Sequence, residues 1–296
     1  MKAVNPLSLT EHQARQYLEK IRWPEGPTCP RCKKQEIIAV SGGRAGLYNC
    51  RCCRRQFTMT VGTIFEGSHI SLAKWVQAFH LLCASKKGMS ALQLSRMLGI
   101  TYKSAWHMAH RIRYVMQPSS TSPRLKGTVE ADETFVGGGP NHKAKTPTKA
   151  RKTPVFAAVE RDGGARTKVL PSLSAKSLNI AMVRSINPRA VLMTDERPAY
   201  DRLGAKYERH LSVKHSAGEY VRGNVYTNTV ESFFALLKRG IMGSYHHVSR
   251  KHLPRYCDEF AFRWSHRGVS DAIRTTTALR QTTGKRLQYK QVIGVN

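Results

Sequence analysis

Two pairs of cysteines constrain the fold of this chain more than any other feature. Cys29 and Cys32 form one Cys-x-x-Cys pair, Cys50 and Cys53 form a second, and seventeen residues separate the pairs. Two thiolates at this spacing can reach one ion from a single tight turn, and two such turns complete a tetrahedron. Cys52 is an alternative partner for Cys50, but the two-residue spacing favours Cys53. The pattern predicts a structural Zn²⁺ site, closed by four thiolates and without an open position for catalysis.

The segment around these cysteines, residues 24–66, is rich in Pro, Gly, Cys and Arg and lacks helical periodicity. So short a segment cannot bury enough apolar surface to stay folded without a staple such as a metal ion. We expect a zinc ribbon with three short strands: Glu36–Val40, Leu47–Cys50 and Gln56–Met59. A helix that Ser8 or Thr10 could cap is expected before it, within residues 1–23.

The net charge indicates the kind of partner. Lys and Arg total 49 against 19 Asp and Glu, so the formal net charge is +30. Each Lys or Arg that neutralises a phosphate releases a counterion, which makes nucleic acid the expected ligand of so basic a surface. No apolar run reaches the roughly 18 residues that a membrane helix needs, and the first residues lack an apolar secretory stretch. We therefore expect a cytoplasmic protein without membrane partners.

Residues 67–117 have helical periodicity. Within them, Gly88–Val115 predicts two helices joined at Gly99, which resembles a helix-turn-helix. The second helix would present polar side chains to a DNA groove, namely Tyr102, Lys103, Ser104, His107 and Arg111. Any pair of helices with a glycine turn has a similar pattern, so an ordinary helical hairpin is the alternative interpretation.

A linker by composition, residues 118–124, precedes a segment with mixed α/β periodicity at residues 125–275. Strands are expected at Gly127–Val136, Val155–Glu160, Thr167–Leu170 and Ala190–Thr194, and helices at Ser174–Ile186, Asn228–Arg239 and Arg250–Trp264. The remaining residues, 276–296, are expected to form a C-terminal tail.

Three acids stand out in apolar settings of this basic chain. Asp132 lies on the first expected strand, where it shares a face with Glu130 and opposes Glu133. Asp195 follows a buried strand, and Glu231 lies early in a helix. Three carboxylates without Cys or His suit hard cations such as Mg²⁺ or Mn²⁺, and phosphoryl transfer uses two such ions. Each acid taken alone could equally form only a cap or a salt bridge.

The spacing of these motifs resembles the bacterial insertion-sequence DDE transposases that have an N-terminal zinc ribbon and an RNase H-like catalytic domain (ISXO-like transposases). The N-terminal matches are Cys-Pro-Arg-Cys at 29–32, Cys-Arg-Arg-Gln-Phe at 53–57 and Thr-Val-Gly-Thr-Ile-Phe at 60–65. The later matches are Glu-Ala-Asp-Glu-Thr-Phe-Val-Gly-Gly at 130–138, Thr-Asp-Glu at 194–196, Thr-Asn-Thr-Val-Glu-Ser-Phe-Phe-Ala-Leu-Leu-Lys-Arg-Gly at 227–240 and Tyr-His-His-Val-Ser at 245–249. The resemblance spans roughly residues 5–270.

The resemblance implies that Asp132, Asp195 and Glu231 are the catalytic acids and bind two Mg²⁺ or Mn²⁺ ions. Some members of the family have an Asn as the third ligand, and Asn228 lies one helical turn before Glu231. We favour Glu231, because a carboxylate neutralises metal charge better, and assign Asn228 to orienting water or DNA. Contacts to DNA are also expected from three side chains further along, namely Lys238, Arg239 and His247. His246 and His247 could contact phosphate near the site, but a pair of histidines after a helix more often has a structural role.

The implied activity is transposition: cleavage of DNA at the ends of an insertion sequence, followed by strand transfer into target DNA. The implied partners are double-stranded DNA, as terminal inverted repeats and as target, and further copies of the chain in a homo-oligomer on DNA. The expected place is the nucleoid. Two alternatives remain: a catalytically silent DNA-binding protein of this architecture, and an RNase H-like nuclease without strand transfer.

Overall fold

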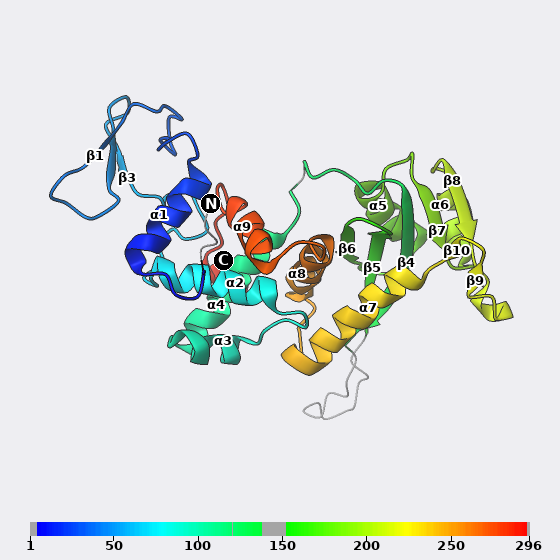
Figure 1. The fold of residues 1–296 in the computed structure, drawn as a ribbon. Helices are drawn as coiled ribbons and strands as arrows, with labels where there is room; N and C mark the ends of the chain where they lie inside the picture. The colour runs from blue at the N-terminus through cyan, green and yellow to red at the C-terminus, as the bar shows by residue number, and fades with distance from the viewer. Residues whose placement is uncertain (1–4, 120, 138–151, 295–296) are drawn as a thin grey trace. The chain divides into compact units, whose positions relative to one another are not determined.

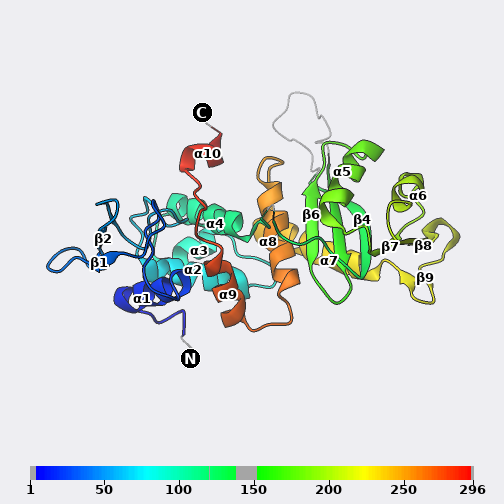
Figure 2. The same cartoon turned by 90° about the horizontal axis from the view of Figure 1, so that it is seen from above.

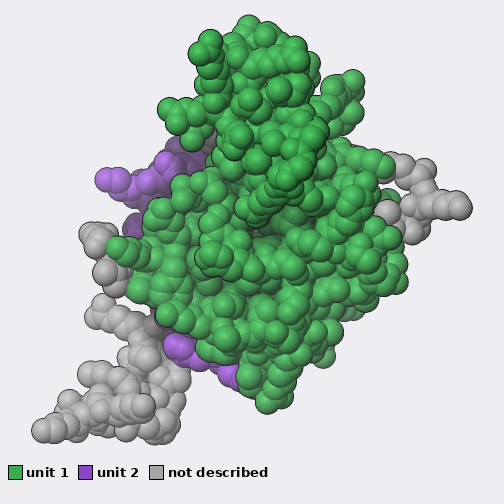
Figure 3. All heavy atoms as spheres, turned by 90° about the vertical axis from the view of Figure 1, so that its left-hand side faces the viewer, with its two compact units in different colours: residues 1–116, 268–296 green, residues 117–267 purple. Residues whose placement is uncertain are grey.

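The computed structural model describes residues 5–119, 121–137 and 152–294. They fall into two compact units, which Figure 3 colours separately: residues 1–116 together with 268–296, and residues 117–267. The first unit therefore includes the C-terminal segment, and the second ends at Arg267 rather than at residue 275. Among the described residues, no helix has both the length and the apolar character needed to cross a membrane.

The first unit begins with helix α1 and a small antiparallel sheet (Figure 1). The elements are α1 (Glu11–Arg22), β1 (Ile37–Ala39), β2 (Tyr48–Cys50) and β3 (Gln56–Phe57), in the sheet order β1-β2-β3. Thr10 caps α1 in a capping box with Gln13, as one of the two expected caps. The rings of Trp23, Tyr48 and Phe57 pack together, with centroids 5.6 to 5.9 Å apart. This cluster packs the end of α1 against strands β2 and β3 of the ribbon.

The rest of the first unit is helical. Its elements are α2 (Leu72–Ala84), α3 (Ala91–Leu98), α4 (Tyr102–Met116), α9 (Asp271–Arg280) and α10 (Tyr289–Ile293). Gly99 ends α3 in the left-handed conformation, as its predicted place in the turn requires. The apolar face expected for α4 is buried, from Ala105 to Val115. Helix α9 packs against α2, where Arg274 donates to the carbonyl oxygen of Cys83 at 3.0 Å.

The second unit is built on a five-stranded mixed sheet. Its strands are β4 (Thr128–Val136), β5 (Thr153–Glu160), β6 (Ala165–Val169), β7 (Val191–Thr194) and β8 (Arg209–Ser212). Their spatial order is β6-β5-β4-β7-β8. The first three strands form an antiparallel meander, and β7 and β8 are added parallel to β4. This mixed sheet confirms the mixed α/β layout that the sequence predicts for the segment.

Helices cover both faces of this sheet, as Figure 2 shows. Alternate residues of β5 point to opposite faces. Phe156 and Ala158 pack against α5 (Ala175–Ser185) and α6 (Pro198–Gly204). Val155, Ala157 and Val159 pack against α7 (Asn228–Gly240) and α8 (Leu253–Ser265). Since Asp132 pairs with Ala157 across the strands, it lies on the α7 side, and Glu133 lies on the α6 side.

Several elements of the second unit were not predicted from the sequence. They are β8, α6, the 3-10 turn η1 (His215–Ala217), the hairpin strands β9 (Val221–Arg222) and β10 (Val225–Tyr226), and the π-helical turn η2 (Ile241–Tyr245). Apart from α6, each of these elements has five residues or fewer. Elements this short carry too few residues for a periodicity to be visible.

Candidate functional site

The four predicted zinc ligands lie together in the ribbon. The Sγ atoms of Cys29 and Cys53 are 3.6 Å apart, and those of Cys32 and Cys50 are 3.5 Å apart. All four lie within 4.8 Å of one another, whereas Cys52 is exposed outside the group. Zinc–sulfur bonds of about 2.3 Å place tetrahedral sulfurs about 3.8 Å apart, so the cluster fits a structural Zn²⁺ ion.

The two cysteine turns have the same backbone geometry. In each, the first cysteine donates its N–H to a carbonyl five residues on: Cys29 to Lys34 and Cys50 to Arg55, both at 3.0 Å. The residue after the second cysteine has a positive φ, 61° at Lys33 and 54° at Arg54. The equivalence of the two turns assigns Cys53, and not Cys52, to the second pair.

The strand register brings the two aspartates to the same end of the β4–β7 ladder. Glu130 of β4 is paired with Met193 of β7 in the parallel ladder. Asp132 lies two residues further along β4, and Asp195 directly follows Thr194, the last residue of β7, so both acids lie just beyond the last paired residues of this parallel ladder. Neighbouring strands run about 4.8 Å apart. Ligands bind parallel sheets at such carboxyl ends, where loops give access to the site.

Glu231 approaches the aspartates from the first turn of α7. Its side chain is 49% exposed, and its Oε1 accepts a hydrogen bond from Thr227 Oγ1 at 3.0 Å. The Nε2 atom of His215 lies 4.0 Å from the same oxygen. Asp132 and Asp195 are half-buried. The three acids therefore form an open cluster, with the aspartates at its base and Glu231 toward solvent.

The carboxyl group of Asp132 lies near several other acidic side chains. Burial raises the pKa of its carboxyl to about 7, and the negative charges of Asp195, Glu133 and Glu231 add to the rise. Among the described residues, the four cysteines are the only group of three or more potential ligands whose donor atoms all lie within 4.8 Å. The three acids thus act on one another electrostatically without being in mutual contact. A cation between them would relieve this repulsion.

Glu130 fixes α7 against the sheet. Its carboxylate is fully buried and accepts four hydrogen bonds. Its Oε2 accepts from the backbone N–H groups of Thr229 and Val230 at 2.7 and 3.0 Å, and its Oε1 accepts from Thr229 Oγ1 at 2.9 Å and from Arg161 Nε at 2.7 Å. Thr227, at the N-cap of α7, makes no side-chain cap of its own. Glu130 supplies that cap from β4 and so places Glu231 near Asp132.

Glu133, on the opposite face of β4, fixes the loop that carries Asp195. Its carboxylate accepts from Tyr200 Oη at 2.5 Å and from Arg197 Nη1 at 3.1 Å. The backbone N–H of Arg197 in turn donates to Asp195 Oδ1 at 3.2 Å. The strand alternation predicts that Glu130 and Glu133 lie on opposite faces of β4, which the structure confirms, but it indicates no role for either glutamate. The alternation of acids along one strand was the available signal.

The cap predicts a large loss of stability for Glu130→Gln. The amide would turn an N–H₂ donor toward the N–H groups of α7 and would leave Arg161 without its buried carboxylate. Breaking a buried ion pair costs about 3–5 kcal/mol. Urea unfolding of the second unit, combined with hydrogen exchange of α7, measures the effect. The control is Glu208→Gln, an exposed acid beside β8. Equal stability of the two variants would contradict the capping role.

The residues expected to contact DNA along α7 lie on its surface. Asn228, Lys238, Arg239 and His247 are all exposed. Arg239 is held by its own helix, with Nε donating to the carbonyl oxygen of Ala235 at 3.2 Å. Asn228 lies one helical turn before Glu231 and is exposed to solvent. These positions are compatible with the predicted roles, which stay predictions.

In α4 the expected DNA-contacting residues divide into two groups. Tyr102 is 57% exposed, and the Lys103 ammonium is exposed above the ring of Tyr289, 4.8 Å from its centroid. Arg111 does not face a groove: only 5% exposed, it donates to the carbonyl oxygen of Glu66 at 2.7 Å and lies over the ring of Trp75. A buried guanidinium engaged in this way cannot contact phosphate, so Arg111 leaves the candidate set.

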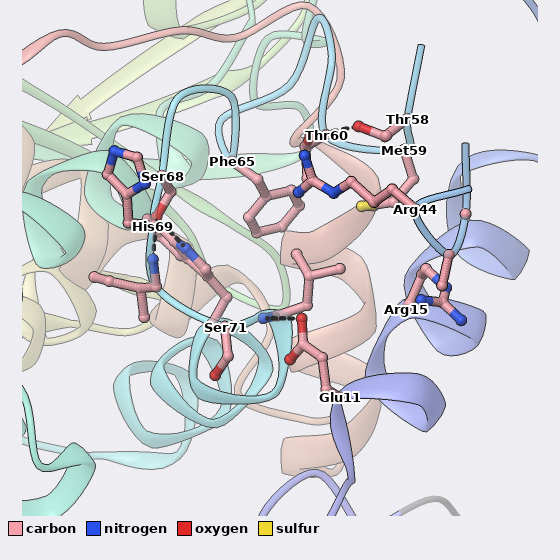
Figure 4. A pocket seen from close by; sticks show the side chains of 15 residues that line it. Glu11, Arg15, Arg44, Thr58, Met59, Thr60, Phe65, Ser68, His69 and Ser71 are labelled. Atoms are coloured by element: carbon pink, nitrogen blue, oxygen red, sulfur yellow. Dashed lines mark hydrogen bonds between the residues drawn. The ribbon is translucent and has the colours of Figure 1, made fainter. Parts of the chain in front are cut away.

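A cavity of about 410 Å³ lies in the first unit, between α1, the end of the ribbon and the start of α2 (Figure 4). Arg15, Arg44 and His69 contribute to its lining, together with Phe65. Its one carboxylate is Glu11, whose two oxygens already accept from the N–H groups of Leu72 and Ala73 at 3.0 Å. This cavity therefore offers no free acid for metal binding.

Comparisons with known proteins show the family of this chain. The ISXO2-like transposase domain matches residues 124–265, and the transposase zinc-ribbon domain matches residues 9–56. These two matches cover the acid cluster and the four cysteines, and they define a transposase with an N-terminal zinc ribbon. The chain belongs to the ISXO2-like transposase family.

A curated relative is described as an uncharacterized protein in transposable element ISH50 of Halobacterium salinarum. It is 30% identical over 274 residues, which cover 86% of this chain and 91% of the relative. Among solved structures, the Mos1 strand transfer complex matches at 14% identity, over 70% of this chain and 75% of that chain, with a TM-score of 0.27. A likeness at that score supports no conclusion about the activity of this chain.

Proposed function

We propose that this chain binds the ends of an insertion sequence, cleaves them and joins them to target DNA, with Asp132, Asp195 and Glu231 as the metal-binding catalytic acids. The observation that carries the proposal is the convergence of three carboxylates from two parallel strands and one helix. Three observations support this proposal: the β4–β7 ladder ends just before both aspartates, Glu130 caps the helix that carries Glu231, and the charges of Asp195 and Glu231 contribute to the raised pKa of Asp132.

The donor set suits Mg²⁺ or Mn²⁺, because all three side chains offer oxygen and none offers sulfur or nitrogen. When bound there, such ions activate the attacking oxygen and stabilise the leaving oxygen of a phosphodiester. The chain's own part is positioning. Asp132 must lose its proton to act as a ligand, and a nearby cation favours that loss by lowering its pKa.

The second part of the proposal concerns the residues that bind DNA. The exposed side chains of Lys238, Arg239 and His247 follow the acid cluster along α7 and beyond it. Asn228 stands one turn before Glu231 and can donate to water or phosphate. In the first unit, Tyr102 and Lys103 are exposed at the start of α4 and are proposed to contact DNA. We further propose that copies of the chain assemble on the two ends that transposition must join.

The experiment is a single-turnover nicking assay on a labelled duplex that carries one element end with its flanking DNA. With Mg²⁺, the zinc-loaded protein should nick at the end of the element, whereas without added Mg²⁺ it should bind the duplex and leave it intact. A scrambled end of equal length is the control. The same products, incubated with a supercoiled plasmid, should become joined to it.

Each outcome of this assay decides between the hypotheses. Nicking without joining would indicate the nuclease alternative. Binding of the element end with no cleavage in Mg²⁺ or Mn²⁺ would indicate the silent DNA-binding protein. Either result would overturn the proposed function.

A further inference from the structure

A short hairpin beside the acid cluster is firmly attached at its base. Strands β9 and β10 lead from β8 into α7, and Figures 1 and 2 show them at the end of the sheet near the start of that helix. Arg161 donates to the carbonyl oxygens of Asn224 and Tyr226 at 2.9 and 3.1 Å. Its guanidinium also lies 3.5 Å from the centroid of the Tyr226 ring. The same arginine binds Glu130, so one network fixes both the hairpin and α7.

The turn before the hairpin is fixed as well. Glu196, the residue after Asp195, accepts a hydrogen bond from the backbone N–H of Ser216 at 2.9 Å. His215, in the same 3-10 turn, lies 3.5 Å from Thr227 Oγ1 and 4.0 Å from Glu231 Oε1 through its Nε2 atom. The backbone of this turn is therefore hydrogen-bonded to the residue after Asp195, and the side chain of His215 lies next to Glu231.

Tyr220 extends this arrangement outward. Its ring packs on that of His215, with centroids 5.2 Å apart and planes inclined by 32°. Yet 62% of the Tyr220 side chain is exposed, and the next residue, Val221, is 53% exposed. Neither residue contributes to the two apolar clusters that cover the faces of the sheet. An aromatic ring supported on one side and open to solvent beside an acid cluster is not explained by packing.

Nucleic-acid chemistry gives such a ring a ligand. Every base has a π-face, and stacking of a base on an aromatic side chain is sequence-tolerant. A base that has left the helical stack, next to the phosphodiester to be cut, would bring such a face to the cluster. The hairpin also has a cation of its own: Arg222 is anchored by Glu219 at 3.3 Å and by the carbonyl oxygen of Ser212 at 2.9 Å.

We propose that Tyr220, backed by His215, is a stacking site for an unpaired or unstacked nucleobase adjacent to the cleaved phosphodiester. This inference rests on the proposed function and adds a ligand subsite to it. The ring would hold the nucleotide next to the reacting phosphate, so that the DNA strand keeps one register on the acid cluster. The aromatic face is the required property, and neither the hydroxyl nor apolar bulk alone would replace it.

The test compares four substitutions at this position in the full-length, zinc-loaded protein. Tyr220→Ala and Tyr220→Leu should slow single-turnover nicking by about tenfold to a hundredfold, whereas Tyr220→Phe and Tyr220→Trp should remain within about twofold of the unsubstituted protein. Ile180→Ala, which removes an exposed apolar side chain from α5 on the other face of the sheet, is the matched control. Thermal midpoints and zinc content verify that each variant is folded.

A second measurement locates the base. We would place 2-aminopurine at each position next to the cleavage point and record fluorescence without added Mg²⁺. At one position the 2-aminopurine fluorescence should be higher with Tyr220→Ala than with Tyr220→Phe, because the unstacked base then has no aromatic ring on which to stack. A mismatch at that position should restore part of the nicking lost in Tyr220→Ala, since less stacking must then be broken.

The outcomes separate this inference from the function on which it rests. If the unsubstituted protein nicks the element end and Tyr220→Ala nicks equally fast, the stacking site is wrong and the proposed function stands. If Tyr220→Leu is as active as Tyr220→Phe, the site binds an apolar group rather than a base, which also overturns the inference. Absence of nicking by the unsubstituted protein would overturn both.

Discussion

Asp132→Asn and Asp195→Asn are each expected to reduce Mg²⁺-dependent nicking by about a thousandfold or more while DNA binding stays near its original level. Each substitution removes one negative charge from the cluster and leaves the size of the side chain almost unchanged. The bound ions supply several kcal/mol of stabilisation to the charge that develops at the phosphate, and about 4 kcal/mol corresponds to a thousandfold in rate. The assay is single-turnover nicking, with filter binding of the same duplex measured in parallel.

The same assay decides the third ligand. If Glu231 binds metal, Glu231→Gln should approach the loss seen at the aspartates, and Asn228→Ala should cost about tenfold through a misplaced DNA strand or water. The reverse order would assign the third position to Asn228. Glu208→Gln is again the control, because it removes an exposed acid of the same unit. Full nicking by both Asp132→Asn and Asp195→Asn would contradict the assignment of the cluster.

Cys29→Ser is expected to unfold the ribbon and to abolish specific DNA binding. The ribbon has few buried residues beside its cysteines and one cluster of three aromatic rings. In small zinc-binding peptides, structural zinc contributes roughly 10–16 kcal/mol of apparent binding free energy to folding. This is far more than so small an apolar core supplies. Hydrogen exchange should show residues 29–57 losing protection, and specific binding should fall at least about a hundredfold.

Cys52→Ser is the matched control for this loss, because Cys52 is an exposed cysteine of the same segment that lies outside the cluster. It should bind zinc and DNA as the unsubstituted chain does. Specific binding that survives in Cys29→Ser would show that the ribbon is not needed for DNA recognition. A loss of zinc from Cys52→Ser would show instead that the second pair is wrongly assigned.

The sequence predicts the fold best where a periodicity is long. The expected strand at Gly127–Val136 and the observed β4 differ by one residue, because nine residues alternate between two buried faces. Strand β8 was not predicted because it is a short edge strand, Arg-His-Leu-Ser, that contains one aliphatic residue. Its position depends on parallel pairing with β7, which is a long-range interaction that no local pattern contains.

Arg111 illustrates the same limit within the first unit. It follows Lys103 and His107 at intervals of four residues, so the helical period places all three on one polar face. The C-terminal segment covers part of that face: His107 Nε2 lies 3.2 Å from the carbonyl oxygen of Leu287, and Tyr289 packs on His107. Glu66 and Trp75 engage Arg111 itself. The sequence alone does not indicate that these residues and the C-terminal segment pack against α4, and it therefore predicts an exposed face.

For the candidate site, residue type, spacing and the family resemblance select Asp132, Asp195 and Glu231 as candidates, but they do not indicate what positions these acids. The roles of Glu130 and Glu133 depend on partners that are distant in sequence, such as Val230 and Tyr200. Supporting residues of this kind become visible only when the strand and the helices are placed together.

The central claim is that Asp132 and Asp195 hold the catalytic metal. It is tested most directly by titrating Mn²⁺ into the zinc-loaded protein bound to a pre-nicked element end. Electron paramagnetic resonance then measures the concentration of free Mn²⁺. We expect saturable Mn²⁺ binding that Mg²⁺ displaces, and we expect the Asp132→Asn, Asp195→Asn double variant to lose this binding while it still binds the DNA. Equal Mn²⁺ binding by the double variant and the unsubstituted protein would contradict the central claim.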